Sequence, residues 1–477
     1  MTSESKQGPH QDLQDCLWFE QLGPTLAARP SLTGAIKADI AIVGGGFTGL
    51  WTALFLAKLN PNACITVVES QHVGFGASGR NGGWLMGSLE GVEALLTGCT
   101  PAQKAQSLSA LTSLVTDVQL TLSQEGIDCD LAHGGGIFGG ARFPEQAQRA
   151  RDHLKMLYQI GFNENDYRWL SPEESYARVA AADSCGGIYT PHVATLNPAK
   201  LVNGLAEAAE RHGVVIYENS SVTHIAKGVV STAQGRINAD QLVIATEGFT
   251  QHLATLSKRL LPVQSDMVAT APLPAAIWQQ LGFHHREAFS DFSRLSTYLQ
   301  RTADDRLIIG ARGSYKFGGK VVSQFSDRDA DFKRRAKLKD LLFPILRDHP
   351  LTHAWGGTLA VPRSFSPHIV IDSAQGMSTA GGYLGEGVGA SYLFGKTLAE
   401  NLSGKTKAQN DWPWLKFGTI ASQLKPWEAE PLPWLGFNAT LMSYDLEEWA
   451  YSRGKSRTVK HVTTWLANTI DNVIQAS

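Results

Sequence analysis

Three glycines with the spacing of a phosphate-binding turn are the residues of this chain that most directly indicate chemistry. Gly44, Gly46 and Gly49 form a G-x-G-x-x-G pattern that follows the apolar run 38–43 and opens a helical pattern. Glu69 ends a second apolar run 20 residues after Gly49. A strand, a glycine turn, a helix and a terminal acid within about 30 residues are the full context of a dinucleotide-binding βαβ unit.

Each of these residues has a physical role in such a unit. Gly44 permits the tight turn, Gly46 lets the backbone approach a pyrophosphate, and Gly49 lets the helix lie against the strand. The N–H groups and the dipole at the helix start favour the diphosphate. Glu69 can accept hydrogen bonds from ribose hydroxyls, and its charge repels a 2′-phosphate, so NADP is disfavoured. The motif alone does not separate NAD from FAD, and a glycine turn without a nucleotide is the structural alternative.

Composition excludes several other classes of protein. A chain of 477 residues is expected to form two or three domains, and 43% hydrophobic with 18% charged residues describes ample core. The formal charge of −2 gives no basic field for nucleic acid. No apolar run reaches the roughly 18 residues of a membrane span, and residues 1–37 hold none long enough for a signal peptide.

Cysteine and histidine usage argues against disulfides and against a metal site. The five cysteines are scattered, odd in number and without a C-x-x-C pair, which fits a reducing cytoplasm best. His284 and His285 are adjacent on an expected loop, point apart and have no acidic partner at ligand spacing, so no metal is predicted there.

The remaining patterns predict an alternation of nucleotide-type units with a β-rich region. Apolar spacing near 3.6 predicts helices over 101–125, 144–160 and 198–212, and a glycine turn at 380–389 opens a helix that runs to about 402. Short strands are expected at 137–138, 214–217, 241–245, 295–300 and 306–310. Residues 405–477 hold half of the twelve tryptophans, and since such rings need burial, this tail is expected to pack on the body or on a second subunit.

A chain that leaves its nucleotide unit, builds a sheet and returns is typical of FAD proteins with a discontinuous cofactor domain. An NAD dehydrogenase more often keeps its nucleotide fold contiguous. The predicted fold is therefore mixed α/β, with a discontinuous Rossmann-like FAD-binding domain and an inserted antiparallel β-sheet substrate domain. The expected division is an extension at 1–37; an FAD-binding domain from 38–100, 186–261 and 355–404; a substrate domain from 101–185 and 262–354; and the tail at 405–477.

Four segments together carry a family resemblance. Gly44–Glu69, the run Gly-Ala-Ser-Gly-Arg-Asn-Gly-Gly at 76–83, Ala245-Thr246 and Gly-Glu-Gly-Val at 385–388 resemble the D-amino-acid-oxidase superfamily of flavoenzymes. The resemblance is closer to its γ-glutamylputrescine oxidase-like branch, covers roughly residues 38–402, and leaves the tail outside.

The resemblance implies which residues surround FAD. The βαβ unit would hold the ADP half, the loop at 76–84 would wrap the flavin, Val222 would meet the adenine edge, and the helix start at 385–388 would face the flavin N1–C2=O edge, where it stabilises reduced flavin. The implied cofactor-binding residues are Gly44, Gly46, Phe47, Thr48, Gly49, Glu69, Ser70, Gly76, Ala77, Ser78, Arg80, Asn81, Gly82, Gly83, Trp84, Val222, Thr246, Gly385, Glu386, Gly387 and Val388. Some relatives attach FAD through His or Cys, but the run 76–83 contains neither, so non-covalent FAD is expected.

Flavoenzymes of this type oxidise a C–H bond next to an amine nitrogen, with the hydride going to flavin N5 and the imine then hydrolysing. Positioning is the main requirement, and no dedicated base is obligatory. By resemblance, Tyr298, Arg301, Arg312 and Trp355 line the substrate pocket, where an arginine could clamp an anionic group. The structural alternative is that these four residues lie on the half-buried surface of a sheet, or that the two arginines form ion pairs with Asp304 and Asp305.

The sequence thus predicts an FAD-dependent amine or amino-acid oxidoreductase that acts on a small molecule and is reoxidised by oxygen or another acceptor. A D-amino-acid dehydrogenase-like enzyme that reduces a quinone, a non-catalytic flavin-binding subunit and a contiguous NAD-dependent dehydrogenase remain alternatives. Oligomerisation is possible. Neither nucleic acid nor a membrane span is expected, and the cytoplasm is the expected compartment.

Overall fold

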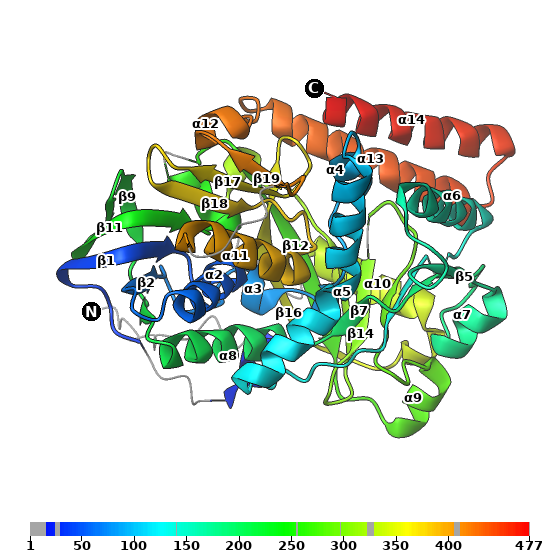
Figure 1. Ribbon diagram of the computed structural model, residues 1–477. Helices are drawn as coiled ribbons and strands as arrows, with labels where there is room; N and C mark the ends of the chain where they lie inside the picture. The colour runs from blue at the N-terminus through cyan, green and yellow to red at the C-terminus, as the bar shows by residue number, and fades with distance from the viewer. Residues whose placement is uncertain are drawn as a thin grey trace, which may run out of the picture.

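The computed structural model describes residues 16–23, 29–139, 141–253, 256–295, 297–321, 329–404 and 411–476, with the side chain of Arg312 outside the described set. These residues form two large sheets with helices packed around them (Figure 1). In the described part of the chain, no helix is long and apolar enough to cross a membrane.

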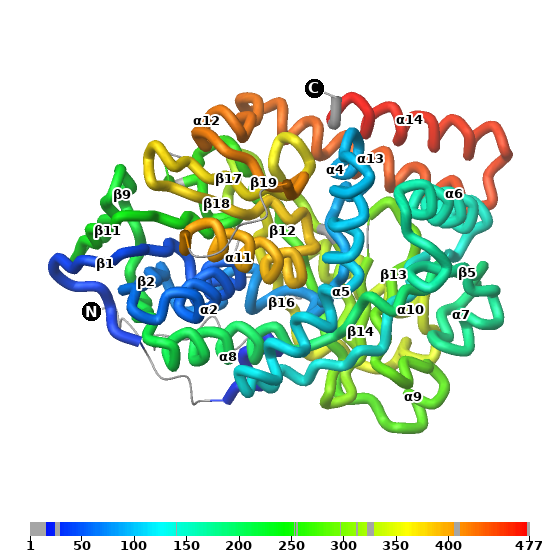
Figure 2. The backbone as a smooth tube through the Cα atoms, in the orientation of Figure 1, coloured from blue at the N-terminus to red at the C-terminus, as the bar shows by residue number. Residues whose placement is uncertain are grey.

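A nine-stranded sheet forms the half of the molecule that contains the glycine-rich turn. Its main path runs β19-β17-β18-β11-β1-β2-β8, and β10 and β9 extend from β11. β1 pairs in parallel with both β2 and β11, so Figure 2 shows the blue strand β1 beside the green strand β11. The strands are β1 (Gly34–Val43), β2 (Ile65–Val68), β8 (Val215–Tyr217), β9 (Val222–Ala226), β10 (Val229–Thr232), β11 (Gly235–Ile244), β17 (His368–Asp372), β18 (Met377–Gly381) and β19 (Leu415–Phe417).

Helices α2 (Phe47–Leu59) and α11 (Gly387–Ser403) pack along each other next to this sheet. α2 is apolar almost all round because it is enclosed by the sheet, by α11 and by α8 (Pro198–Arg211). A Cβ on Gly395 would lie 2.7 Å from Trp51 Cβ, so the close crossing of α2 and α11 requires a glycine.

An eight-stranded sheet, β16-β12-β15-β14-β13-β4-β6-β5, forms the second half. All neighbours in it are antiparallel except β13 and β4. Its strands are β4 (Gly136–Phe138), β5 (Arg168–Leu170), β6 (Gly187–Thr190), β12 (Leu260–Thr270), β13 (Ala288–Ser290), β14 (Thr297–Arg301), β15 (Leu307–Arg312) and β16 (Leu351–Pro362). β3 (Trp84–Met86) and β7 (Val193–Thr195) pair with each other and form a separate two-stranded sheet.

The longest helix shows how local signals set the ends of an element. α5 (Pro101–Glu125) begins at a capping box in which Thr100 Oγ1 accepts from Gln103 N at 3.2 Å and the Gln103 side chain returns to Thr100 N. It ends at Gly126, which takes the left-handed conformation with φ +66°. The other helices are α1 (Leu17–Glu20), α3 (Ala77–Arg80), α4 (Val92–Leu96), α6 (Pro144–Ile160), α7 (Pro172–Arg178), α9 (Ala275–Leu281), α10 (Ala330–Leu342), α12 (Ile420–Gln423), α13 (Leu432–Ser452) and α14 (Arg457–Ala476).

This architecture confirms the predicted fold class and the predicted helices over 101–125, 144–160 and 198–212. The sheets divide the chain differently from the expected domain ranges. β6 lies at 187–190 and β16 extends to 362, and both strands belong to the eight-stranded sheet although the expected ranges gave 186–261 and 355–404 to the cofactor domain. The difference arises because long-range strand pairing, rather than local composition, sets these limits.

The C-terminal residues contribute to both halves. β19 pairs in parallel with β17 at the edge of the nine-stranded sheet, while α13 and α14 pack together as a hairpin. Trp414 is fully buried and stacks on Trp412 at 5.0 Å, whereas Trp449 and Trp465 are 44% and 60% exposed. Trp434, the third tryptophan on the hairpin, is 36% exposed, so burial holds for some of the tail's tryptophans and not for the three on the hairpin.

Candidate functional site

The carboxyl ends of three parallel strands meet at one edge of the nine-stranded sheet. Val43 of β1 is paired with both Val68 of β2 and Ile244 of β11, so the residues that follow these strands converge. Ligands of open α/β sheets bind at such an edge. The chain turns sharply there at Gly44, with φ +109°, and a Cβ on Gly44 would lie 2.5 Å from the carbonyl oxygen of Ala245.

The start of α2 lies at the same edge and offers backbone donors. Gly46 is the N-cap and forms no side-chain cap, while the N–H of Phe47 donates to Ser78 Oγ at 2.9 Å. A Cβ on Gly46 would lie 2.8 Å from that oxygen, and one on Gly49 would lie 2.0 Å from the carbonyl oxygen of Gly44. The turn is thus kept narrow, and the start of α2 attracts an anion through its dipole, although the N–H of Phe47 is bonded to Ser78 Oγ.

Glu69 follows β2 and braces this turn. Its Oε2 accepts from the N–H of Gly45 at 2.7 Å, and its Oε1 accepts from the N–H of Gln71 at 3.0 Å and from Ser70 Oγ at 3.1 Å. Burial raises the pKa of Glu69, and the N–H donors oppose that shift. The acid at the end of the second strand therefore fixes the glycine turn as well as facing the cavity described next.

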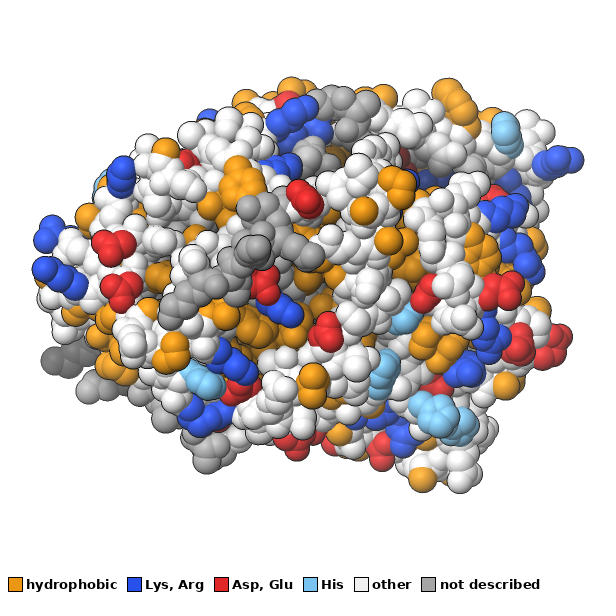
Figure 3. Space-filling model, viewed as in Figure 1, with side chains coloured by type: hydrophobic (Ala, Val, Ile, Leu, Met, Phe, Trp, Pro, Cys, Tyr) orange, Lys and Arg blue, Asp and Glu red, His pale blue; other side chains and the backbone are white. Residues whose placement is uncertain are grey.

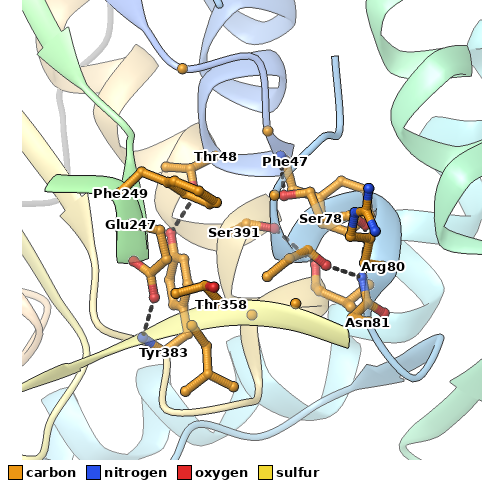
Figure 4. Close-up of a pocket in the computed structure, with 18 of the residues that line it drawn as sticks. Phe47, Thr48, Ser78, Arg80, Asn81, Glu247, Phe249, Thr358, Tyr383 and Ser391 are labelled. Atoms are coloured by element: carbon orange, nitrogen blue, oxygen red, sulfur yellow. Dashed lines mark hydrogen bonds between the residues drawn. The ribbon is translucent and has the colours of Figure 1, made fainter. Parts of the chain in front are cut away.

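A cavity of about 430 Å³ connects the glycine turn with the loop after β2 and with the eight-stranded sheet (Figure 4). This size lies in the usual range for small-molecule and cofactor sites. The residues expected at the site that line it are Gly44, Gly46, Phe47, Thr48, Glu69, Ser70, Gly76, Ala77, Ser78, Arg80, Asn81, Gly82, Trp84, Val222, Thr246, Tyr298, Gly385, Glu386, Gly387 and Val388.

The loop at 76–84 is held in place largely by its own hydrogen bonds. Asn81 Nδ2 donates to the carbonyl oxygens of Ala77 and Ser78 at 3.1 and 2.8 Å, and Asn81 Oδ1 accepts from the N–H of Gly83 at 2.7 Å. Figure 4 shows Ser78, Arg80 and Asn81 on one side of the cavity. Gly83 itself is not part of the cavity lining.

Arg80 is 4% exposed and is enclosed by aromatic rings. Its Nε donates to the carbonyl oxygen of Phe75 at 2.9 Å, and its guanidinium lies over the rings of Phe75 and Phe19 at 5.3 and 5.9 Å. Trp355 is 1% exposed and its Nε1 donates to the carbonyl oxygen of Arg80 at 3.0 Å. Trp355 therefore supports the loop from behind and does not line the cavity.

Strand β14 presents Tyr298 to the cavity and turns Arg301 away from it. Tyr298 Oη and Ser265 Oγ are 2.6 Å apart, while the Arg301 guanidinium is paired with Asp305 at 2.6 Å and lies 4.6 Å from the centre of the Trp278 ring. Residues three apart on a strand face opposite sides, which explains the separation. Arg301 is not part of the cavity lining, and the side chain of Arg312 lies outside the described residues.

Glu247 closes the opposite wall, and the sequence patterns had not singled it out. It accepts hydrogen bonds from the N–H groups of Gly382, Tyr383 and Ala360 at 2.9, 3.3 and 3.3 Å. Tyr383 Oη in turn lies 2.8 Å from Thr48 Oγ1, a contact drawn in Figure 4. Burial raises the pKa of Glu247 to about 7. In the sequence, Glu247 is recognisable only as an acid that follows β11. Its hydrogen-bond partners are more than 100 residues away in sequence, so no local pattern predicts its role.

Phe249, Thr358, Leu359, Ser391 and other residues from distant segments also line the cavity, and no local pattern pointed to them. The start of α11 faces it as well, with Glu386 as the N-cap and no side-chain cap. In the part of the chain that the structure describes, no group of three or more His, Cys, Asp or Glu side chains is arranged to hold a metal ion.

The parallel sheet edge, the glycine turn and the cavity are typical of a nucleotide-cofactor protein, and a second, β-rich half borders the same cavity. Comparison with known proteins gives the family: the model of the DAO family, described as FAD dependent oxidoreductase, matches residues 39–401. The chain belongs to this family of FAD-dependent oxidoreductases, which confirms the resemblance stated from the motifs.

Two curated relatives and one solved structure illustrate the similarity. The chain is 30% identical over 397 residues to a probable oxidoreductase, OrdL, of Rhizobium meliloti, covering 82% of this chain and 88% of the relative. It is 29% identical over 384 residues to a gamma-glutamylputrescine oxidoreductase of Escherichia coli, with 78% and 85% covered. The fold is similar to that of a glycine oxidase from Geobacillus kaustophilus, with a TM-score of 0.64, 24% identity, and 78% and 96% of the two chains covered.

The donor set of the cavity fits FAD. Two helix N-termini without side-chain caps, those of α2 and α11, meet the same cavity and can serve the diphosphate and the flavin's electron-rich edge. Thr246 Oγ1 and Trp84 Nε1 are buried at the lining without a hydrogen-bond partner among the described residues, so each can bind a polar atom of a ligand.

Proposed function

We propose that this protein binds FAD non-covalently and oxidises the C–N bond of a small amine or amino acid. The single observation that carries the proposal is the continuous cavity, which is lined at one end by the turn at Gly44 and Gly46 and at another by Trp84 and Tyr298. One ligand could therefore contact the nucleotide turn while its far end faces the β-rich half.

Relatives support the choice of substrate class. Besides the gamma-glutamylputrescine oxidoreductase, the chain is 24% identical over 388 residues to a sarcosine oxidase subunit beta of Arthrobacter and 26% identical over 288 residues to a glycine oxidase of Geobacillus kaustophilus. Each of these names denotes an enzyme that acts on an amine or an amino acid.

When bound, FAD would supply a hydride acceptor at N5, and the imine product would hydrolyse to an aldehyde or keto acid with release of amine or ammonia. The chain's own residues would perform binding and orientation. Gly44, Gly46 and the first N–H groups of α2 would hold the diphosphate, the loop at 76–84 would hold the ring system, and Tyr298 would limit where the substrate lies. Oxygen is the proposed acceptor and the cytoplasm the proposed compartment.

The surface agrees with a small-molecule substrate. On the face shown in Figure 3, Lys and Arg side chains are interspersed with Asp and Glu, and the formal charge of the chain is −2. Such a mixed surface gives no extended positive field for a nucleic acid.

The test is spectroscopic. Purified protein should be yellow, and heat or acid should release its flavin into the supernatant, as expected for a non-covalent complex. Under anaerobic conditions, a panel of primary and secondary amines and amino acids should bleach the flavin absorbance, and air should restore it with formation of hydrogen peroxide. Bleaching that only a quinone reverses would favour the dehydrogenase alternative, and a flavin that no amine or amino acid reduces would contradict the amine proposal.

A further inference from the structure

The C-terminal hairpin of α13 and α14 lies along the outside of the molecule (Figure 1). Among the described residues, more than half of the large hydrophobic side chains that are exposed belong to this hairpin. They are Leu432, Trp434, Leu435, Met442, Leu446, Trp449, Val462, Trp465 and Val473. Single exposed apolar residues are normal on a protein surface, whereas a gathered set of them marks an interaction surface.

Most of these side chains form one stripe along each helix. The stripe of α13 consists of Leu435, Met442, Leu446 and Trp449, and that of α14 consists of Val462, Trp465 and Val473. Their spacing of three, four, seven or eight residues brings the members of a stripe to the same side of a helix. We call the two stripes together the outer face of the hairpin.

The opposite sides of both helices are used by the hairpin itself and by the body. Tyr451 Oη of α13 lies 2.7 Å from Thr464 Oγ1 of α14. Arg294 of the body pairs with Glu447 of α13 at 2.7 Å and with Asp471 of α14 at 3.1 Å. On each helix, these polar contacts lie opposite to the apolar stripe, so the outer face points away from the body.

The turn that joins the two helices is basic. Arg453, Lys455 and Arg457 are exposed there, and no Asp or Glu occurs between residues 450 and 470. Lys455 Nζ lies 4.6 Å from the centre of the Trp449 ring, which places a cation at the border of the outer face. The hairpin therefore joins an apolar face to a positively charged end.

The acids of the hairpin are paired with arginines of the body. The ion pairs are Asp445–Arg334, Glu447–Arg149, Glu448–Arg142 and Asp471–Arg294. Lys460 pairs with Glu145 of α6 at 2.8 Å, so it is not counted with the basic turn. The positive charge of the turn is therefore not balanced by an acid of the hairpin.

We propose that the outer face and the basic turn bind the surface of a membrane that contains anionic lipids. The apolar side chains of the outer face enter the region between the headgroups and the acyl chains, where the indole rings of Trp449 and Trp465 are favoured. Arg453, Lys455 and Arg457 lie beside the anionic headgroups. The hairpin lies on the membrane surface and does not cross it.

Charge favours a lipid surface over a second copy of this chain as the occupant. An anionic lipid surface complements the outer face and the basic turn together. A second copy would match the outer face, but the acids of its own hairpin are already paired with its body. The inference goes beyond the proposed function and does not depend on its cofactor or its substrate.

Binding is tested by flotation of the purified full-length protein with lipid vesicles. Vesicles of phosphatidylcholine alone are compared with vesicles of an equimolar mixture of phosphatidylcholine and phosphatidylglycerol. The protein should bind the anionic vesicles about tenfold more tightly, and this preference should shrink as salt is added. Failure to bind the anionic vesicles, or equal binding to both kinds, would overturn the proposal.

Two double variants separate the apolar and the basic contributions. Trp449→Ser with Trp465→Ser should weaken binding to the anionic vesicles about tenfold, because less apolar area enters the membrane. Arg453→Gln with Arg457→Gln should weaken it about fivefold per cation and should also reduce its salt dependence. FAD content and circular dichroism establish that each variant is folded. Unchanged binding in both double variants would overturn the assignment to the hairpin.

Matched controls lie elsewhere on the surface. Lys37→Gln with Arg236→Gln removes two exposed cations from β1 and β11, at the other end of the molecule in Figure 1. Leu120→Ser removes an apolar side chain on α5 that is 58% exposed. These variants should bind vesicles as the unaltered protein does. An equal loss of binding in the controls would also overturn the assignment.

The molar mass in solution tests the second copy as the occupant. Light scattering should give the same mass for the unaltered protein and for the variant Trp449→Ser with Trp465→Ser. A dimer that this variant converts to a monomer would overturn the proposal and assign the outer face to a second copy. Vesicle binding is measured without an amine, so its failure leaves the proposed oxidation intact, and a flavin that no amine reduces leaves the membrane contact intact.

Discussion

At the scale of single residues, Glu247 shows how a buried acid can organise a cofactor cavity. Its φ of +43° is unusual for a residue other than glycine, and its carboxylate collects N–H groups from the loop before α11 and from β16. Through Tyr383 and Thr48 the same network reaches α2. Three segments that are far apart in sequence are thereby held at fixed positions around one cavity.

We also expect Glu247 to make the stability of the folded protein depend on pH. Because burial raises its folded-state pKa from the ordinary 4.5 to about 7, the folded protein holds a proton that the unfolded chain releases between these values. This proton contributes about 3 kcal/mol at most to the free energy of unfolding. The contribution is fully present below pH 4.5 and is lost as pH rises through 7. Thermal unfolding from pH 5 to 8 should therefore show a decline that Glu247→Gln reduces. An unchanged slope in the variant would assign the decline to other groups.

Glu69→Gln tests the acid at the other end of the cavity. Glutamine keeps one acceptor for the N–H of Gly45 and places an amide nitrogen where Oε1 now accepts from Gln71 and Ser70. The loss of a charged acceptor should weaken FAD binding about tenfold. Equilibrium titration of the apoprotein with FAD measures this, with the thermal stability of both apoproteins as the control. An equal Kd in the two proteins would show that the carboxylate serves the turn alone.

At the scale of elements, the start of α2 makes a sharper prediction. Gly46→Val adds a side chain whose Cβ lies 2.8 Å from Ser78 Oγ, at the point where backbone N–H groups must approach a diphosphate. The variant should be isolated largely free of flavin, with native-like circular dichroism. Gly436→Ala, on α13 with its nearest side-chain neighbour at 3.6 Å, should keep normal FAD content. Normal flavin absorbance of purified Gly46→Val would place the diphosphate elsewhere.

The elements also show which parts of the fold were predictable from the sequence. α5, α6 and the turn at Gly44 depend on caps, breakers and periodicity within a few residues, so the sequence was sufficient for them. The limits of the second sheet were not predictable, because β16 is defined by its pairing with β12 some 90 residues earlier, for example Trp355 with Met267. The local composition near residue 355 does not predict that pairing partner.

The residues of the site also divide into those that local spacing predicts and those that only long-range contacts define. The glycines and the loop at 76–84 could be identified because their spacing is local. Arg301 was expected in the pocket, although its odd spacing from Tyr298 already implied the opposite face of β14. Glu247, Phe249 and Thr358 could not be found, since what makes them a wall of the cavity is the approach of three distant segments.

At the scale of the whole molecule, a buried acid is central to the ion pairs between the C-terminal hairpin and the body. Glu447 of α13 is 2% exposed and pairs with Arg149 of α6 at 2.8 Å and with Arg294, which precedes β14, at 2.7 Å. These arginines lower the pKa of Glu447 to about 2, against the opposing effect of burial. The contact is therefore stabilising above pH 4.5 and is lost as pH falls through 2.

Glu447→Ala should detach the hairpin before it affects the rest of the protein. Removing the carboxylate leaves Arg149 without its ion pair, while Arg294 keeps its pair with Asp471, so the loss should cost about 3 kcal/mol at most. Since the cavity receives no residue from α13 or α14, FAD absorbance should persist while limited proteolysis cleaves within 432–476. Asp445→Asn is the matched control, because Asp445 is exposed and its contact with Arg334 is 3.5 Å long. If both variants resist proteolysis equally, the remaining contacts of the hairpin, which include the ion pairs Arg142–Glu448, Arg294–Asp471 and Lys460–Glu145, are sufficient to hold it to the body.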